Sequence, residues 1–325
     1  MKITLSSVLT RSLWTAKDIL GSKPITKLLD SGIITEDEQI SNVIAAFGGG
    51  ASVSIPYIKR PVFSEAAIGN DSDTAITPTG LSEVEVKAWI GFFNKAFTEK
   101  DIVKYVGISP DPISKVQDFF GEFWSQQIQN QLVNTLIGCM KANKADNAGD
   151  NILKESAKQF NYDTLVDALV LAGERMDEFD LLIMHPKTKA VIKKANKELF
   201  KIVDFENGAK YELYDGKQVI VSDLCPVDPT DGVTTFIVKR GAFLFAPANV
   251  EFPIEEQRDA KSGNGSGETT IISRMGYMLH PNGYSYIKGQ QASVSPTLAE
   301  LADAKNWKRV VEKEQAPFLA IQTKA

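Results

Sequence analysis

Histidine and cysteine, the residue types most often used in catalysis and metal binding, are scarce in this chain of 325 residues. The two histidines, His185 and His280, each precede a proline, and neither has a second histidine, a cysteine or a carboxylate at metal-ligand spacing. His185 could cap the helix that follows it, whereas His280 lies in a turn. We expect both to be structural, and the sequence predicts no metal site and no cofactor.

The two cysteines, Cys139 and Cys225, lie far apart in the chain. Cys139 falls on the apolar face of a predicted helix, where an unreactive core thiol is the usual case. So few cysteines suggest a reducing compartment and exclude a disulfide-rich secreted scaffold.

The loops contain no complete phosphate-binding, calcium-binding or nucleophile motif. The glycine-rich run 263–267 joins two predicted strands and is not followed by Lys-Ser/Thr, so it predicts a hairpin tip and not a phosphate-binding loop. Asp71 and Asp73 resemble the start of a calcium loop but lack its glycine and distal glutamate. No Gly-x-Ser-x-Gly nucleophile motif is present. The sequence therefore predicts no catalytic residues and no enzyme.

Composition is that of an ordinary globular chain, 43% apolar and 24% charged, with 36 Lys plus Arg against 41 Asp plus Glu and a net charge of −5. A pI near 5.3 argues against a dedicated nucleic-acid binder. No stretch reaches the roughly 20 apolar residues that span a bilayer, so we expect no membrane contact.

The first third of the chain predicts an arm and an extended hairpin. Two short helices are expected over 3–30, and segment 1–30 has a charge of +3, from five basic and two acidic residues. Within 51–80, Val53, Ile55 and Tyr57 alternate with small or polar residues like an edge strand, and 64–80 form a long polar loop. Residues 81–96 return as a strand.

The strongest helical pattern runs from Pro112 to about Ala142, with Asp111 as its cap. At 1.5 Å per residue such a helix is about 46 Å long. A helix of that length is typical of a structural spine, although Gly121 or Gly138 could shorten it.

A self-contained α+β domain is predicted over 151–245. Its expected elements are helices at 162–172 and 187–200, strands at 179–184 and 233–245, and a hairpin over 211–223 that turns at Asp215-Gly216. Further strands are expected at 250–258, 269–279, 284–287 and 318–322, with a helix at 298–304 capped by Ser295-Pro296-Thr297.

An aromatic patch follows the hairpin, with Trp89, Phe92, Phe93 and Phe97. Such a patch is either a core of the chain itself or a surface buried only on assembly. Its position beside an excursion that cannot bury itself favours subunit contacts. The predicted interface residues are Tyr57, Phe63, Trp89, Phe92 and Phe93.

The order of these parts resembles the major capsid protein of tailed bacteriophages, with its Hong Kong 97-like fold. Local segments resemble one coat-protein branch in the same order. They are Asp180-Leu-Leu-Ile-Met-His-Pro, Tyr214-Asp-Gly-Lys-Gln-Val, Arg240-Gly-Ala-Phe, His280-Pro-Asn-Gly-Tyr and Ser295-Pro-Thr-Leu-Ala-Glu-Leu.

The resemblance implies four parts. They are an N-terminal arm (1–48), an extended loop hairpin (49–108), a peripheral domain with the spine helix and long strands (109–150 and 246–294), and an axial domain (151–245 and 295–325).

By the same resemblance, the chain is expected to form hexamers and pentamers of an icosahedral shell around phage double-stranded DNA, which it contacts non-specifically. The shell would be assembled in the host bacterial cytoplasm and become the virion capsid. Some relatives carry a long N-terminal scaffolding segment, whereas the arm here begins at once, which implies a separate scaffolding protein or a prior cleavage. A portal and decoration proteins are further expected partners.

The basic arm is expected to face the genome or to meet the acidic segment 31–75, which has six acidic and two basic residues. Two alternatives remain open at this stage. One is an encapsulin-like compartment that holds protein cargo. The other is a soluble α+β enzyme, which predicts a pocket lined by His185 or Asp223.

Overall fold

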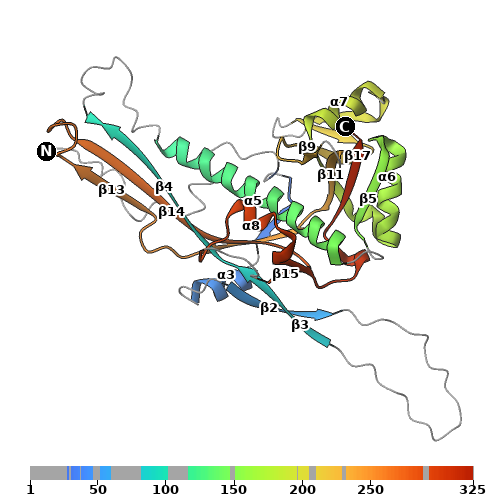
Figure 1. The fold of residues 1–325 in the computed structure, drawn as a ribbon, viewed down its shortest axis with the longest axis horizontal. Coiled ribbons are helices and arrows are strands. Elements are labelled where there is room, and N and C mark those ends of the chain that lie inside the picture. The colour runs from blue at the N-terminus through green and yellow to red at the C-terminus, as the bar shows by residue number, and fades with distance from the viewer. Residues whose placement is uncertain are drawn as a thin grey trace, which may run out of the picture.

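The computed structural model describes residues 28, 31–36, 38–46, 52–59, 82–101, 116–146, 151–195, 197–204, 210–228, 232–287 and 293–324. An elongated five-stranded sheet and an eight-stranded sheet lie at opposite ends of the molecule, with helix α5 running between them (Figure 1). The chain thus combines helices and sheets, as the predicted α+β class requires.

Helix α5, Val116–Asp146, is the predicted spine and is 31 residues long. Its buried apolar side chains recur every three or four residues, which is the spacing of one helix face. They include Phe120, Trp124, Ile128, Leu132, Leu136 and Met140. Neither Gly121 nor Gly138 interrupts the helix. The predicted cap at Asp111 lies outside the described residues.

The five-stranded sheet is built around β14, Glu268–Pro281. One side of β14 pairs with β4, and the other side pairs with β13 and then with β12, so that β14 is the central strand of the sheet. β1 extends the sheet by a parallel pairing with β12. The strand bounds are Ile34–Glu36 (β1), Gly91–Lys100 (β4), Phe243–Ala248 (β12) and Ile254–Asp259 (β13).

The position of β4 differs from the predicted boundary of the extended loop. We expected residues 49–108 to form one hairpin, but β4 pairs with β14 from Gly91↔Tyr277 to Lys100↔Glu268. The alternation of side chains along β4 explains this pairing with β14. Phe93 and Phe97 face the core, and Phe97 packs on Phe120 of α5 with ring centroids 4.8 Å apart. The predicted strand 81–96 is therefore two strands in two different sheets.

The remaining hairpin leaves the body of the molecule (Figure 1). Its strands β2, Ser52–Lys59, and β3, Ser82–Trp89, pair in register from Ser52↔Trp89 to Lys59↔Ser82. Helix α3, Glu38–Ala46, lies beside its base. A small second core joins these elements to the five-stranded sheet, and its buried members are Ile44, Val53, Ala88, Ile90, Ala246 and Met278.

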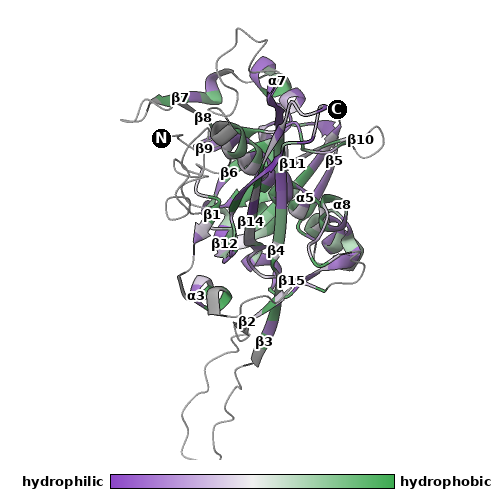
Figure 2. Ribbon diagram, turned by 90° about the vertical axis from the view of Figure 1, so that its left-hand side faces the viewer, coloured by the Kyte–Doolittle hydropathy of each residue, from purple (hydrophilic) through white to green (hydrophobic). Residues whose placement is uncertain are grey.

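The eight-stranded sheet has the order β5-β17-β11-β6-β9-β8-β7, with β10 paired to β11 (Figure 2). β5 and β7 are its two outermost strands. The strand bounds are Leu153–Gln159 (β5), Phe179–Met184 (β6), Phe200–Asp204 (β7), Lys210–Tyr214 (β8), Lys217–Val221 (β9), Val227–Asp228 (β10), Gly232–Lys239 (β11) and Phe318–Lys324 (β17).

Helical segments connect these strands. α6, Tyr162–Leu169, continues into the 3-10 segment η2, Val170–Glu178, and leads to β6. α7, Pro186–Ala195, and η3, Lys197–Leu199, follow β6. The predicted turn at Asp215-Gly216 is confirmed, since both residues have positive φ, 51° and 76°, as a two-residue hairpin requires.

One predicted strand, 233–245, is wrong as a single element. β11 ends at Lys239 in the eight-stranded sheet, and β12 begins at Phe243 in the five-stranded sheet. The chain turns between them at Gly241, which has a positive φ of 65°. Glycine adopts this backbone conformation readily, whereas residues with a side chain rarely do. β5 was not predicted, because this outermost strand is mostly polar and buries only Leu153.

The C-terminal segment contacts α5 and the eight-stranded sheet. Thr297 caps α8, Leu298–Leu301, as predicted, but the helix is shorter than expected and is followed by η4, Ala304–Asn306. α8, η4 and β16, Trp307–Arg309, pack on α5, and β16 pairs with β15, Tyr284–Tyr286. After η5, Lys313–Gln315, β17 enters the eight-stranded sheet. We predicted that residues 295–325 belong to the axial domain, but within this segment only β17 joins the eight-stranded sheet.

Gly138 is required where α5 meets this segment, because a Cβ there would lie 2.0 Å from the carbonyl oxygen of Leu301 and 2.8 Å from the Trp307 ring. We predict that Gly138→Ala lowers the free energy of unfolding by roughly 2 kcal/mol or more, despite the better helix propensity of alanine. Urea denaturation of the unassembled chain measures this. Ser125→Ala on the same helix is the control, and equal stability of the two variants would contradict the packing described.

Candidate assembly surfaces

His185 caps α7, as the sequence predicted. Its Nδ1 accepts a hydrogen bond from the backbone N–H of Lys187 at 3.1 Å. This satisfies one of the N–H groups that are left without a partner in the first turn of a helix.

His280 is buried near the end of β14 and is 1% exposed. Its Nε2 lies 2.6 Å from the Tyr284 carbonyl oxygen, so Nε2 carries the proton and donates it. The ring lies against Trp307, with centroids 5.9 Å apart. Burial lowers the pKa of His280 to about 4, which keeps the ring neutral at ordinary pH.

Both cysteines are buried, and burial raises their pKa values, that of Cys225 to about 12. Such thiols are poor nucleophiles, since the thiolate is the reactive form. The predicted core position of Cys139 on α5 is confirmed.

The described residues contain no group of three or more His, Cys, Asp or Glu arranged to hold a metal ion. A small surface pocket is lined by Phe160, Lys187, Thr188, Val191, Val233, Thr323 and Lys324, and neither His185 nor Asp223 belongs to it. Among the same residues, no helix is long and apolar enough to cross a membrane.

The predicted aromatic patch divides into a buried part and an exposed part. Trp89 is 1% exposed and packs on Phe93 and Tyr277, with centroids 6.3 and 6.4 Å away. Phe93 is partly buried against the same core. The structure therefore uses Trp89 inside the subunit, and only part of the patch is open to a neighbour.

Phe92 is the exposed member of the patch, at 36%. Ser295 holds its backbone, because the Phe92 N–H donates to Ser295 Oγ at 2.8 Å and that hydroxyl lies 3.2 Å from the Phe92 carbonyl oxygen. Val294, beside this contact, is 60% exposed.

Tyr57 lies on β2, where its backbone is paired with Val84. Phe63 lies outside the described residues. A role in subunit contacts stays a prediction for all five residues.

The sequence reasoning missed two exposed apolar surfaces on the eight-stranded domain. Tyr162, Val166 and Val170 follow each other at four-residue steps on α6 and its continuation, and they are 38%, 38% and 61% exposed. Ile202 on β7 is 67% exposed. The i, i+4, i+8 spacing of the first set is the signal that could have revealed it.

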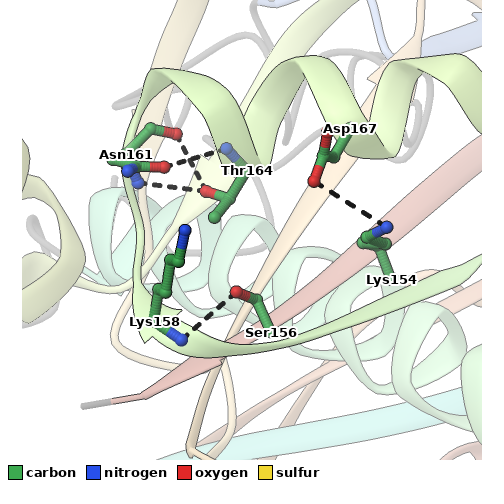
Figure 3. Close-up of polar contacts among 6 residues, drawn as sticks. All are labelled: Lys154, Ser156, Lys158, Asn161, Thr164 and Asp167. Carbon is green, nitrogen blue, oxygen red and sulfur yellow. Dashed lines mark hydrogen bonds and ion pairs between the residues drawn. The ribbon is translucent and has the colours of Figure 1, made fainter.

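Helix α6, which carries this apolar stripe, is held in place by a cap at its N-terminus and by a contact with β5. Asn161 and Thr164 form a reciprocal capping box, with Thr164 N–H donating to Asn161 Oδ1 at 2.9 Å (Figure 3). Asp167 points towards Lys154 of β5, with 3.8 Å between the charged atoms. The cap satisfies backbone donors and fixes where the helix begins.

Comparisons with known proteins identify the class of this architecture. The capsid of Ralstonia phage GP4 is similar in fold, with a TM-score of 0.60 and 11% identity over 100% of this chain and 98% of that one. The holo-SrpI encapsulin complex from Synechococcus elongatus PCC 7942 is also similar, with a TM-score of 0.50 and 10% identity over 97% and 94% of the two chains. The fold is therefore the Hong Kong 97-like fold of tailed-phage capsids.

Sequence comparison goes further than the fold. The major capsid protein of Bacillus phage SPP1 is 26% identical over 322 residues, which cover 96% of this chain and 95% of that protein. The family model described as Major capsid protein 13-like (Gp13-like) matches residues 66–316. The chain belongs to this family. It is a major capsid protein with a structural role in the phage capsid, and the predicted resemblance is confirmed.

The two parts of the aromatic patch should respond differently to truncation. We predict that Trp89→Ala lowers the free energy of unfolding by about 3–5 kcal/mol, because it empties a fully buried site. Phe92→Ala should cost less than about 1 kcal/mol, since this ring is already partly in water. Denaturant unfolding of the unassembled chain measures both, and similar losses would contradict the division described.

His280 makes stability depend on pH. Its pKa is about 4 in the folded chain against an ordinary 6.5, so the unfolded state binds more protons between these values. The buried neutral ring therefore adds up to about 3 kcal/mol to the free energy of unfolding above pH 6.5, and this contribution is lost as the pH falls to 4. We predict that His280→Gln removes this part of the pH dependence. Unfolding curves at pH 7, 5.5 and 4 test it, and an unchanged slope in the variant would refute it.

Proposed function

We propose that this chain assembles, as hexamers and pentamers, into the icosahedral head shell that encloses phage double-stranded DNA. Membership of the major capsid family carries this proposal. The shape of the subunit supports it, since a hairpin leaves the body and the two sheets extend towards opposite ends of the molecule (Figure 1). Such a subunit can contact several neighbours at once.

The hairpin formed by β2 and β3 extends over an adjacent subunit in this proposal. Its base is anchored in the small core around Val53 and Ala88, whereas two strands alone are marginally stable in water. A neighbouring surface would supply the missing burial. Phe92, with Val294 beside it, lies near the anchored end and is the described part of the predicted interface that is open for contact.

DNA is contacted non-specifically in this proposal. The net charge of −5 limits close binding to phosphates and so favours later release of the genome. The basic arm, residues 1–30, would face the genome or the acidic segment 31–75.

The remaining proposed partners follow from the requirements of shell building. A separate scaffolding protein sets the curvature, a portal occupies one vertex, and decoration proteins can reinforce the outer face. Assembly takes place in the host bacterial cytoplasm. The role is structural, and the chain catalyses no reaction.

An encapsulin-like compartment is the second candidate, because one similar structure is an encapsulin. The phage reading is favoured by the family match and by the SPP1 relative. The neighbouring genes discriminate between them, since portal and terminase genes mark a phage and a ferritin-like or peroxidase gene marks a compartment.

A shortened hairpin tests the proposal. Lys59 and Ser82 are directly paired, so an Asn-Gly turn can replace residues 60–81 and close the hairpin. We predict that this variant keeps the melting temperature of the full chain but yields no closed shells when it is expressed with the scaffolding protein of its own genome.

Negative-stain electron microscopy and sedimentation velocity measure shell yield. The full chain, expressed in parallel, is the control and should form shells. Shells of normal size from the shortened chain would contradict the role of the hairpin, and a full chain that stays monomeric would contradict the proposed function.

A further inference from the structure

The two edges of the eight-stranded sheet carry opposite charge. The segment from β5 through η2, residues 153–178, has six acidic and three basic residues, a net charge of −3. The segment from α7 through β7, residues 186–204, has six basic and two acidic residues, a net charge of +4. We call these the acidic edge and the basic edge.

The acidic edge also exposes apolar surface. Val166 and Val170 are 38% and 61% exposed, on the α6 stripe that begins at Tyr162. Charge lies close to this stripe and its continuation into η2. Glu174 and Asp177 are exposed, and neither forms an ion pair with any described residue, although Asp177 acts electrostatically on Lys217 of β9.

The basic edge has the complementary character. Three of the four described side chains of β7, Lys201 to Val203, are exposed, and Ile202 is the most exposed large apolar side chain of the described residues, at 67%. Lys189 and Lys193 are paired with Glu212 at 2.6 and 3.0 Å.

Three other lysines of the basic edge are open to a partner. Lys187, Lys194 and Lys201 are exposed, and they form no ion pair within the described part of the chain. The basic edge thus joins uncompensated positive charge to exposed apolar side chains.

The outermost strands of these two edges, β5 and β7, lie at opposite ends of one sheet, with five strands of the main path between them (Figure 2). The first turns of α7 lie elsewhere, because they line a pocket together with Phe160 of the acidic segment. A contact between the acidic edge of one copy and the basic edge of the next is heterologous, and repeated contacts of this kind close into a ring when the rotation permits. Opposite charges on the two edges favour this head-to-tail arrangement and disfavour contact between like edges.

We propose that the acidic edge of one subunit docks on the basic edge of the next copy of this chain, and that this contact forms the rings of the shell. The inference rests on the proposed function and names the surfaces through which the copies meet. The α6 stripe, centred on Val166 and Val170, would cover Ile202 and Val203. Glu174 and Asp177 would face Lys194 and Lys201. The contact would also cover β7, an exposed edge strand of the kind that proteins generally shield from unwanted pairing.

Charge reversal tests the pairing. The acidic-edge variant is Glu174→Lys with Asp177→Lys, and the basic-edge variant is Lys194→Glu with Lys201→Glu. The fourfold variant combines both, so each edge changes sign but the two edges stay complementary. A control, Glu251→Lys just before β13 with Glu256→Lys on β13 of the five-stranded sheet, makes the same change in total charge as the acidic-edge variant but lies away from both edges.

Each variant is expressed with the scaffolding protein, and shells are counted by electron microscopy and sedimentation. We expect each single-edge variant to lose at least tenfold in shell yield, and the control and the fourfold variant to keep yields near that of the unaltered chain. Matching melting temperatures show that all variants fold.

Normal shells from either single-edge variant overturn the inference. If the basic-edge variant forms normal shells that lack DNA, the inference is also overturned, because the basic edge then contacts nucleic acid and not a neighbouring subunit. A folded fourfold variant that does not recover also overturns it. Failure of the unaltered chain to form shells is a different result, because it contradicts the proposed function itself.

Cross-linking locates the contact directly. Val170→Cys and Ile202→Cys place one exposed thiol on each edge, and the native Cys139 and Cys225 are buried. With a short bismaleimide, shells of the double variant should give a ladder of covalent oligomers on a denaturing gel, whereas each single variant should give none. Shells of the double variant that give no ladder would overturn the proposal.

Discussion

The seam between α5 and β14 holds the molecule together. It is mainly apolar, but two buried hydrogen bonds cross it, from Trp124 Nε1 to Ser273 Oγ at 3.1 Å and from the Tyr277 hydroxyl to Gln131 Oε1 at 2.6 Å. Sliding the helix along the strand would leave these groups buried and unpaired, which is costly. Burial also raises the pKa of Tyr277, so its hydroxyl stays protonated and remains a donor. The seam therefore fixes the register of helix against strand.

The positions of both sheets depend on this register. β14 is the central strand of the five-stranded sheet, and α5 also contacts β5 of the eight-stranded sheet and the C-terminal segment around Trp307. A continuous core of buried side chains passes through all of these elements. The angle between the two sheets is therefore set within one subunit, and the exposed surfaces on either side are presented to neighbours in a defined orientation.

Local signals predicted those parts of the fold that local chemistry decides. The periodicity of α5, the Asp215-Gly216 turn, the Thr297 cap and the His185 cap each depend on neighbours a few residues away. Pairing between distant segments was less visible. β5 is polar because only one of its sides is covered, and β4 joins β14 through contacts more than 150 residues away in the chain.

The candidate surfaces were predicted only in part, for the same reason. An aromatic residue looks alike in sequence whether it fills a core or faces a neighbour, and only the packing on Tyr277 shows that Trp89 is internal. The opposite charges of the two edges became visible only once the strand order was known, because the segments that carry them are close in sequence but contain β5 and β7, the two outermost strands of the sheet.

The central claim is that this chain is a shell subunit whose eight-stranded domains form the rings. A cryo-electron microscopy reconstruction of particles purified after expression with the scaffolding protein tests it most directly. The account predicts closed icosahedral shells in which eight-stranded domains surround the five-fold and six-fold positions, with α6 of each subunit next to β7 of its neighbour. Shells in which these two elements are far apart in every pair of neighbours, or a chain that forms no shell, would contradict it.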